Sequence, residues 1–164
     1  MRPYIHTLLL LIYVLLACCN ASEITENKTL QIVVKYEQSY EVDLSRGIYI
    51  VYYFNKSPTT IKFRLKKNEY DNLQKVFYDL MLHKLPDSLD LVDDCHVMPK
   101  LFTYIDVQTE LRHQKFKINE ECSRFHILDQ GKANRILKFI KHFRELIEQI
   151  PEIRTAPKSD IHYI

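Results

Sequence analysis

The strongest constraint on the fold is a change in hydrophobic period, from two to that of a helix, which occurs twice along the chain. From residue 29 onward apolar and polar residues alternate, with Leu30, Ile32 and Val34 on one side. Alternating or continuous apolar character returns in three further segments, each bounded by turn-forming residues such as Ser45-Arg46-Gly47. These segments predict strands at residues 40–44, 48–54 and 60–65.

A helical period follows this first group of strands. Asn68 is in a position to cap the helix, and Pro86 is expected to end it. The helix would bury an apolar stripe that consists of Tyr70, Leu73, Phe77, Leu80 and Met81.

The same succession then repeats in the second half of the chain. A second group of strands is predicted at residues 101–107, 115–119 and 125–128. A second apolar stripe between Ala133 and Ile150 predicts a final helix, which Pro151 would stop. We expect residues 152–164 to be an extended, partly docked segment.

The order strands, helix, strands, helix favours an antiparallel sheet with both helices packed on one face. We therefore predict an α+β fold, a two-layer sandwich with a mostly antiparallel sheet of about five to seven strands. No linker-like composition and no internal repeat interrupts the pattern, so residues 29–164 are expected to form a single domain.

The first 17 residues have the layout of an export signal. Arg2 provides a positive start, and residues 8–17 form an unbroken apolar run that is too short to cross a bilayer. We expect residues 1–17 to be removed as a signal peptide.

Two processing sites compete at the end of this signal. The segment Leu15-Leu16-Ala17-Cys18 resembles the lipobox of bacterial lipoproteins. That resemblance implies a lipid anchor on Cys18 in the cell envelope, with residues 18–28 as a flexible tether. The alternative is ordinary cleavage after Ala21, which would leave a periplasmic or secreted protein.

The net charge limits the classes of partner that the protein is expected to bind, and the cysteines indicate the compartment in which it folds. The formal net charge is +2, and loss of Arg2 with the signal lowers it by one, so we expect no nucleic-acid partner. Cys95 and Cys122 lie outside the signal region. In an exported chain such a pair predicts a disulfide.

Acidic residues precede both of these cysteines: Asp93, Asp94, Glu120 and Glu121. If the disulfide forms, the four carboxylates come near one another and make a possible binding patch for Ca²⁺ or for a basic partner protein. The alternative, which we favour, is that they are solvated loop residues beside a structural disulfide.

Other chemistry has little support in the sequence. A zinc site that adds His96 and His126 to the cysteines is disfavoured, because adjacent Cys-His ligands are awkward and the disulfide consumes the thiols. The motifs G-x-S-x-G and H-E-x-x-H and a glycine-rich phosphate loop are absent. We predict no cofactor and no enzymatic activity.

Two further groups of residues suggest surfaces. Tyrosines of the first strands would form a platform for a glycan or a protein if one face of the sheet were uncovered, although tyrosine is also simply common in strands. They are Tyr36, Tyr40, Tyr49, Tyr52 and Tyr53. The basic side of the last helix either rests on anionic headgroups or is an ordinary solvated face. It consists of Lys138, Lys141, His142 and Arg144.

Together these features predict a non-catalytic protein of the cell envelope, anchored to the membrane by lipid, that binds or supports another envelope protein. One alternative is a secreted inhibitor of an extracellular or lytic enzyme, which would present its acidic patch to a basic target. A second alternative is a small hydrolase without a recognisable motif.

Mass spectrometry of the mature N-terminus tests the first of these expectations. We expect the mature chain to begin with a lipid-modified Cys18, because Cys18 directly follows an apolar run and Ala17. A mature chain that begins with an unmodified Ser22 would contradict the lipid anchor and support simple cleavage.

Overall fold

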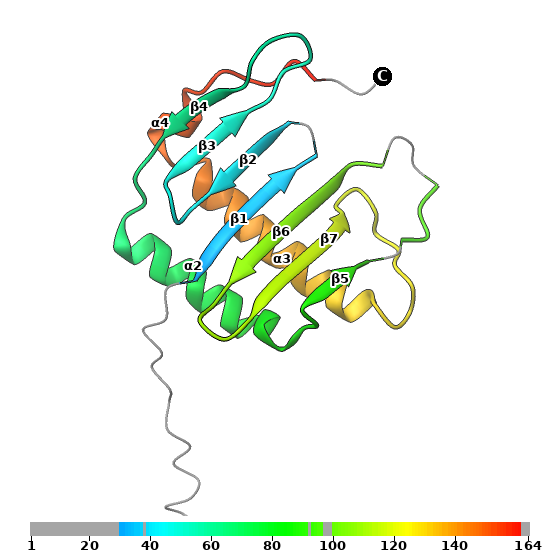
Figure 1. The fold of residues 1–164 in the computed structure, drawn as a ribbon. Helices are drawn as coiled ribbons and strands as arrows, with labels where there is room; N and C mark the ends of the chain where they lie inside the picture. Colours follow the sequence, from blue (N-terminus) through cyan, green and yellow to red (C-terminus); the bar gives the residue numbers. More distant parts are fainter. Residues whose placement is uncertain (1–29, 38, 92, 97–99, 162–164) are drawn as a thin grey trace, which may run out of the picture.

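The computed structural model describes residues 30–37, 39–91, 93–96 and 100–161. The predicted signal peptide, the tether and Cys18 lie outside the described residues. The elements follow one another as β1 (Gln31–Tyr36), β2 (Tyr40–Asp43), β3 (Ile48–Val51), β4 (Thr59–Lys62), α2 (Lys67–Asp79), η1 (Leu82–Lys84), β5 (Ser88–Asp90), β6 (Phe102–Gln108), β7 (His113–Asn119), α3 (Gln130–Ile147) and α4 (Pro151–Arg154) (Figure 1).

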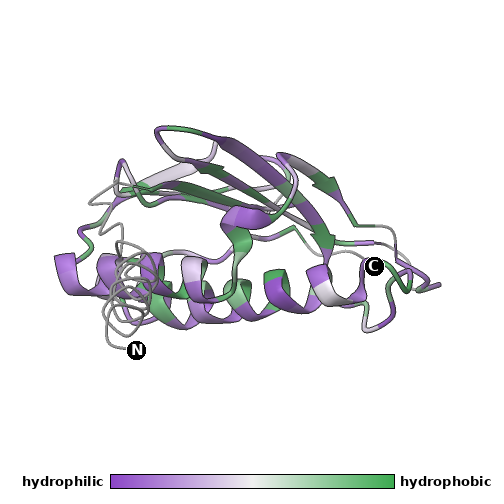
Figure 2. Ribbon diagram, turned by 90° about the horizontal axis from the view of Figure 1, so that it is seen from below, coloured by the Kyte–Doolittle hydropathy of each residue, from purple (hydrophilic) through white to green (hydrophobic). Residues whose placement is uncertain are grey.

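In the described part of the chain the strands form one seven-stranded sheet, in the order β4-β3-β2-β1-β6-β7-β5. Neighbouring strands are antiparallel except for β5, which pairs in parallel with β7 at one edge. The helices α2 and α3 lie on the same side of the sheet, and none of the described elements covers its other face (Figure 2). The predicted α+β two-layer sandwich is confirmed.

The core lies between the sheet and the two long helices. Alternate residues of each strand point to opposite faces, so in β1 the buried side chains are Ile32, Val34 and Tyr36. The register continues this apolar face into neighbouring strands, because Val34 is opposite Val42 of β2 and Ile105 of β6. Burial of this face against helices is the main source of stability for the fold.

Each helix contributes an apolar stripe to the same core. Leu73 and Phe77 are buried on α2, and on α3 the buried set includes Phe139. The rings of Phe77 and Phe139 meet edge to face, with centroids 5.9 Å apart, and this contact joins the two helices. Throughout the described residues, no helix is both long enough and apolar enough to cross a bilayer.

The second group of strands differs from the prediction at its end. Residues 125–128 do not form a strand, and Phe125 makes only an isolated bridge with Asp93. Ile127 and Leu128 instead project into solvent, with 85% and 76% of their surfaces exposed. The sheet edge beside β7 is occupied by β5, which is only three residues long and therefore gives too short a pattern to recognise.

The first helix begins and ends earlier than predicted. Its N-cap is Lys66 rather than Asn68, and the Lys66 N–H donates a hydrogen bond of 2.9 Å to Glu69 Oε2. The helix stops at Asp79, and Met81 adopts a left-handed conformation with φ of 53°. Met81, which was predicted to lie in the apolar stripe, is 47% exposed as a result.

The C-terminal part of the chain continues beyond the predicted stop. The final helix α3 ends at Ile147, shortly before Pro151, but Pro151 also begins the short helix α4, a role that suits its fixed φ and missing N–H. The tail then docks against the strand-to-turn segment after β3, as expected. Ser159 Oγ donates a hydrogen bond of 2.7 Å to the Tyr52 carbonyl, and the Phe54 N–H donates one of 2.9 Å to Asp160 Oδ1.

The predicted disulfide between Cys95 and Cys122 is present, with the two Cα atoms 5.7 Å apart. It ties the segment after β5 to the segment after β7. By the chain-entropy argument, closing a loop of 27 residues stabilises the fold by about 3–4 kcal/mol. The bond therefore restrains Glu120 and Glu121, which lie between β7 and Cys122.

The two glycines of the chain provide a matched test of this backbone. Gly47 has a φ of 60°, and a Cβ there would collide with the Phe63 carbonyl oxygen, whereas nothing lies within 4 Å of a Cβ at Gly131. We expect Gly47→Ala to lower the free energy of unfolding by about 2 kcal/mol or more. Gly131→Ala should raise it by about 0.5 kcal/mol, because alanine suits a helix better.

Urea denaturation at neutral pH measures both changes. Equal stability of the two variants would contradict the turn geometry assigned to Gly47.

Candidate functional site

The most site-like feature is a cleft where the β1–β2 turn and the ends of β6 and β7 meet α3. It consists of two cavities, of about 370 Å³ and about 450 Å³, which share Tyr40 and Arg144 as lining residues. We call it the tyrosine–arginine cleft and define its centre by Tyr36, Tyr40, Glu120 and Arg144.

Strand pairing brings the tyrosines of the cleft together. Tyr36 ends β1 and Tyr40 begins β2, and the two residues are paired across the short turn between these strands. Both lie on the helix side of the sheet, and their ring centroids are 4.2 Å apart. Tyr49 of β3 extends the row, at 5.6 Å from Tyr40.

Arg144 reaches the cleft from α3 and joins it to the end of β7. Its Nη2 donates a hydrogen bond of 2.6 Å to Glu120 Oε2, and its guanidinium lies 5.3 Å from the centroid of the Tyr36 ring. Glu120 also accepts a hydrogen bond from Thr103 Oγ1 of β6. The Glu120 side chain is only 18% exposed, so this ion pair is partly shielded from solvent.

The electrostatics of the cleft keep its tyrosines neutral and Arg144 charged at neutral pH. Burial raises the pKa of Tyr36 and of Tyr40, and burial together with Tyr40 raises the pKa of Tyr49 to about 12. Burial by itself lowers the pKa of Arg144, but Tyr36 and Glu120 outweigh it and the net pKa is raised. The cleft therefore presents neutral phenols and a charged guanidinium.

One polar group of the cleft makes no hydrogen bond of ordinary geometry. The Tyr36 hydroxyl is buried, the residue is only 8% exposed, and the described residues offer this oxygen no well-aligned partner, although the side chains of Arg144 and Tyr40 lie close enough to affect its pKa. A buried hydroxyl in this situation costs about 1–3 kcal/mol relative to a satisfied one. A ligand that supplied a hydrogen bond in the adjoining cavity would recover that energy.

The four carboxylates predicted as a binding patch do not gather at one point. Asp93 accepts hydrogen bonds from Lys100 Nζ at 2.9 Å and from the Cys95 N–H at 3.1 Å, and its side chain is only 3% exposed. Burial raises the pKa of Asp93, but these hydrogen bonds outweigh it and leave the pKa below its usual value. Glu120 and Glu121 line the cleft instead, and Asp94 is exposed.

This arrangement offers little to a metal ion. Among the described residues, the cluster of possible metal-binding atoms consists of Asp93 with Cys95 and Cys122, whose sulfur atoms are bonded to each other. A cation would therefore meet one carboxylate, whereas Ca²⁺ takes about six to eight oxygen ligands. The described residues therefore give no support to the Ca²⁺ patch that the sequence left as a possibility.

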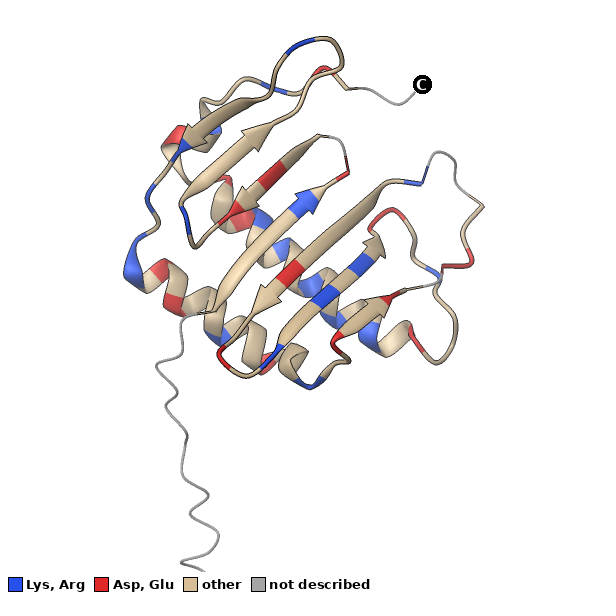
Figure 3. Cartoon of the chain, viewed as in Figure 1, with Lys and Arg blue, Asp and Glu red and all other residues tan. Residues whose placement is uncertain are grey.

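The predicted tyrosine platform is also rearranged. One face of the sheet is indeed uncovered, and it carries charged residues of both signs (Figure 3). However, Tyr36, Tyr40 and Tyr49 point toward the helices, and Tyr53 is buried. Of the five tyrosines, Tyr52 lies on the uncovered face, where its hydroxyl donates to Glu41.

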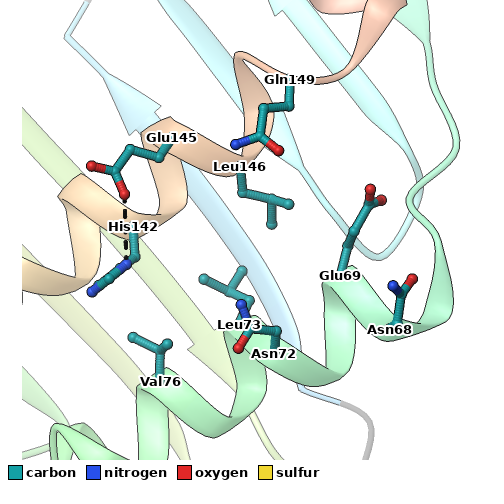
Figure 4. Close-up of a pocket in the computed structure, with 9 residues that line it drawn as sticks. All are labelled: Asn68, Glu69, Asn72, Leu73, Val76, His142, Glu145, Leu146 and Gln149. Atoms are coloured by element: carbon teal, nitrogen blue, oxygen red, sulfur yellow. Dashed lines mark ion pairs between the residues drawn. The ribbon is translucent and has the colours of Figure 1, made fainter.

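A second depression lies between α2 and α3 and has a volume of about 410 Å³ (Figure 4). His142 and Glu145 form an ion pair of 3.7 Å at its rim, and Leu73 and Leu146 contribute apolar surface. None of the buried polar atoms that lack a partner in the described chain belongs to this groove. The tyrosine–arginine cleft is therefore the better candidate for a binding site.

In comparisons with protein-family models, curated proteins and solved structures, nothing matched this chain. The chemistry of the cleft is therefore the basis for the functional proposal below. The sequence pattern had pointed to its tyrosines and to Glu120 and Glu121, but it had placed Arg144 on the solvated side of the last helix.

Tyr36→Phe tests the poorly satisfied hydroxyl. We expect the free energy of unfolding to rise by about 1 kcal/mol, because the variant removes a buried polar group that makes no well-aligned hydrogen bond. The control is Tyr52→Phe, which removes the hydrogen bond to Glu41 and should be neutral or slightly destabilising. Urea denaturation measures both, and a loss of stability in Tyr36→Phe would contradict the assignment.

The pH dependence of stability provides a second measure on the same variant. The pKa of Tyr36 is raised in the fold, so the folded state resists ionisation of this phenol more than the unfolded state does. The part of the free energy of unfolding that depends on the neutral phenol is therefore fully present below the ordinary tyrosine pKa of 10.0 and is lost as the pH rises above it. The decline of stability above this pH should be shallower in Tyr36→Phe than in the unsubstituted protein.

Proposed function

We propose that this chain is an exported, lipid-anchored protein of the cell envelope that binds another envelope component through the tyrosine–arginine cleft. The disulfide between Cys95 and Cys122 supports the export, because such bonds persist in oxidising compartments. The anchor rests on the lipobox resemblance at Cys18.

The observation that carries the binding role is the buried hydroxyl of Tyr36, which makes no well-aligned hydrogen bond and borders a cleft of polar groups. A fold that keeps such a group loses stability, and this cost is typical of positions retained for function. Tyr36 and Tyr40 stay protonated at neutral pH, so they are suited to hydrogen bonding rather than to proton transfer. This chemistry favours binding over the hydrolase alternative.

The two halves of the cleft differ in charge, and this difference suggests the kind of ligand. The smaller cavity has Glu37, Glu120 and Glu121 around Arg144. The larger one combines Arg144 and Glu148 with Arg154 and Lys158 beside apolar residues such as Ile147 and Ile153. An extended peptide segment, which carries both charges and apolar side chains, complements such a surface, so we propose another envelope protein as the partner.

The inhibitor alternative receives less support from the geometry. It needs an acidic patch that is free to meet a basic enzyme. Asp93 and Glu120 are instead neutralised by Lys100 and Arg144 within the fold.

The binding role is tested by in-membrane cross-linking of the tagged full chain, with the recovered partner then titrated against purified variants. We expect Tyr36→Phe combined with Tyr40→Phe to weaken binding about tenfold, because two hydrogen-bonding hydroxyls are removed from the cleft. The matched control is Tyr52→Phe combined with Tyr104→Phe, two tyrosines of the uncovered face.

The cleft variant should keep the fold and bind the partner more weakly, while the control should keep both the fold and the affinity. Equal affinity of the two double variants would place the binding site elsewhere and overturn the proposal.

A further inference from the structure

Two stretches of the chain, residues 46–67 and residues 124–141, carry an excess of positive charge, and the second includes most of α3. Between Arg124 and Lys141 there is one acidic residue, Asp129, although the formal charge of the whole chain is only +2. The cations of this stretch are Arg124, Lys132, Arg135, Lys138 and Lys141. We call these five residues the α3 basic face, although Arg124 lies in the loop before the helix. Lys and Arg residues recur along α3 in Figure 3.

The helix directs these cations away from the core. The buried stripe of α3 includes Ile136, Ile140 and Phe143, whereas Lys138 and Lys141 are exposed. Because α3 lies in the layer opposite the sheet, its exposed side forms part of the outer surface of that layer (Figure 2). Arg144, which the sequence had grouped with these cations, is turned into the cleft and paired with Glu120.

Three of these five cations form no ion pair with another described residue. Lys132 pairs with Asp129 at 2.7 Å, and Lys141 lies 3.9 Å from Glu145. Over the described residues, no ion pair is formed by Arg124, Arg135 or Lys138.

Two large apolar side chains project at the start of the same face. Ile127 and Leu128 are 85% and 76% exposed, and they directly precede Asp129, the N-cap of α3. Single exposed apolar residues are ordinary, but an adjacent aliphatic pair beside a basic surface combines the two features of interfacial membrane segments. A purely polar polyanion would leave this pair in water.

We propose that the α3 basic face docks on an anionic lipid bilayer, with Ile127 and Leu128 entering the interfacial region. The inference rests on the proposed function in one respect, because the lipid anchor is what holds the domain at the membrane. Basic residues near an anionic leaflet attract it, and apolar side chains then leave water at the headgroup boundary. In this orientation the uncovered face of the sheet points away from the membrane.

The absence of tryptophan from the sequence allows a clean test. Leu128→Trp places a single fluorescent reporter on the proposed contact. Leu111→Trp is the matched control, because Leu111 is 77% exposed but lies in the β6–β7 hairpin of the sheet layer. The full chain carrying either substitution is reconstituted into phosphatidylcholine vesicles with or without phosphatidylglycerol, and brominated lipid serves as quencher.

We expect blue-shifted, quenched emission from Leu128→Trp in vesicles that contain phosphatidylglycerol, and weaker quenching in neutral ones. Leu111→Trp should show neither change. Adding Lys138→Glu and Lys141→Glu to Leu128→Trp should lower the docking equilibrium at least roughly 30-fold, because the loss of two attractive charges alone accounts for about that factor and the new carboxylates add repulsion. Lys62→Glu with Lys115→Glu, two cations of the uncovered sheet face, is the charge control and should leave docking unchanged.

Flotation of the same samples separates this inference from the anchor. A chain that floats with neutral vesicles, yet shows no quenching of Leu128→Trp in anionic ones, would overturn the docking face and leave the anchor supported. Equal quenching in neutral and anionic vesicles would also overturn it, because the contact would not depend on charge. A chain that fails to float with neutral vesicles but is quenched in anionic ones would support the docking face and overturn the anchor.

Discussion

Burial of one face of the sheet under α2 and α3 is the constraint on which the other features of this protein depend. The strands supply alternate apolar residues to that face, and the contact of Phe77 with Phe139 joins the two helices above it. Because both helices are used on one side, the opposite face of the sheet stays uncovered in the described structure. The same packing brings Arg144 of α3 against Tyr36 of β1.

The cleft shows how a polar site is built into such an interface. Arg144 is held by Glu120, which lies between the end of β7 and Cys122, so the disulfide restrains the segment that positions the ion pair. Tyr36 lies beside this pair, and its hydroxyl makes no well-aligned hydrogen bond with the described residues. Packing and the disulfide offset that local cost, and the polar groups remain preorganised for a ligand.

Much of the architecture was predictable from local pattern, but short or context-dependent elements were not. Period two in β1 and the long stripe of α3 predict their elements because one face of each must be buried. Residues 125–128 are also mostly apolar, yet they do not join the sheet, and β5 pairs with β7 instead. Pro151 is likewise typical of a residue that follows the end of a helix, although it also suits the first turn of a new helix such as α4.

The sequence by itself determined the two-layer α+β class and the pairing of Cys95 with Cys122, because periodicity and the number of available cysteines depend only on the chain. The tertiary structure decided which charges meet. Arg144 and Lys138 belong to one basic helix, yet Arg144 binds Glu120, 24 positions away, while Lys138 stays in solvent. Such contacts depend on the angle and height at which α3 crosses the sheet, and no local period specifies either.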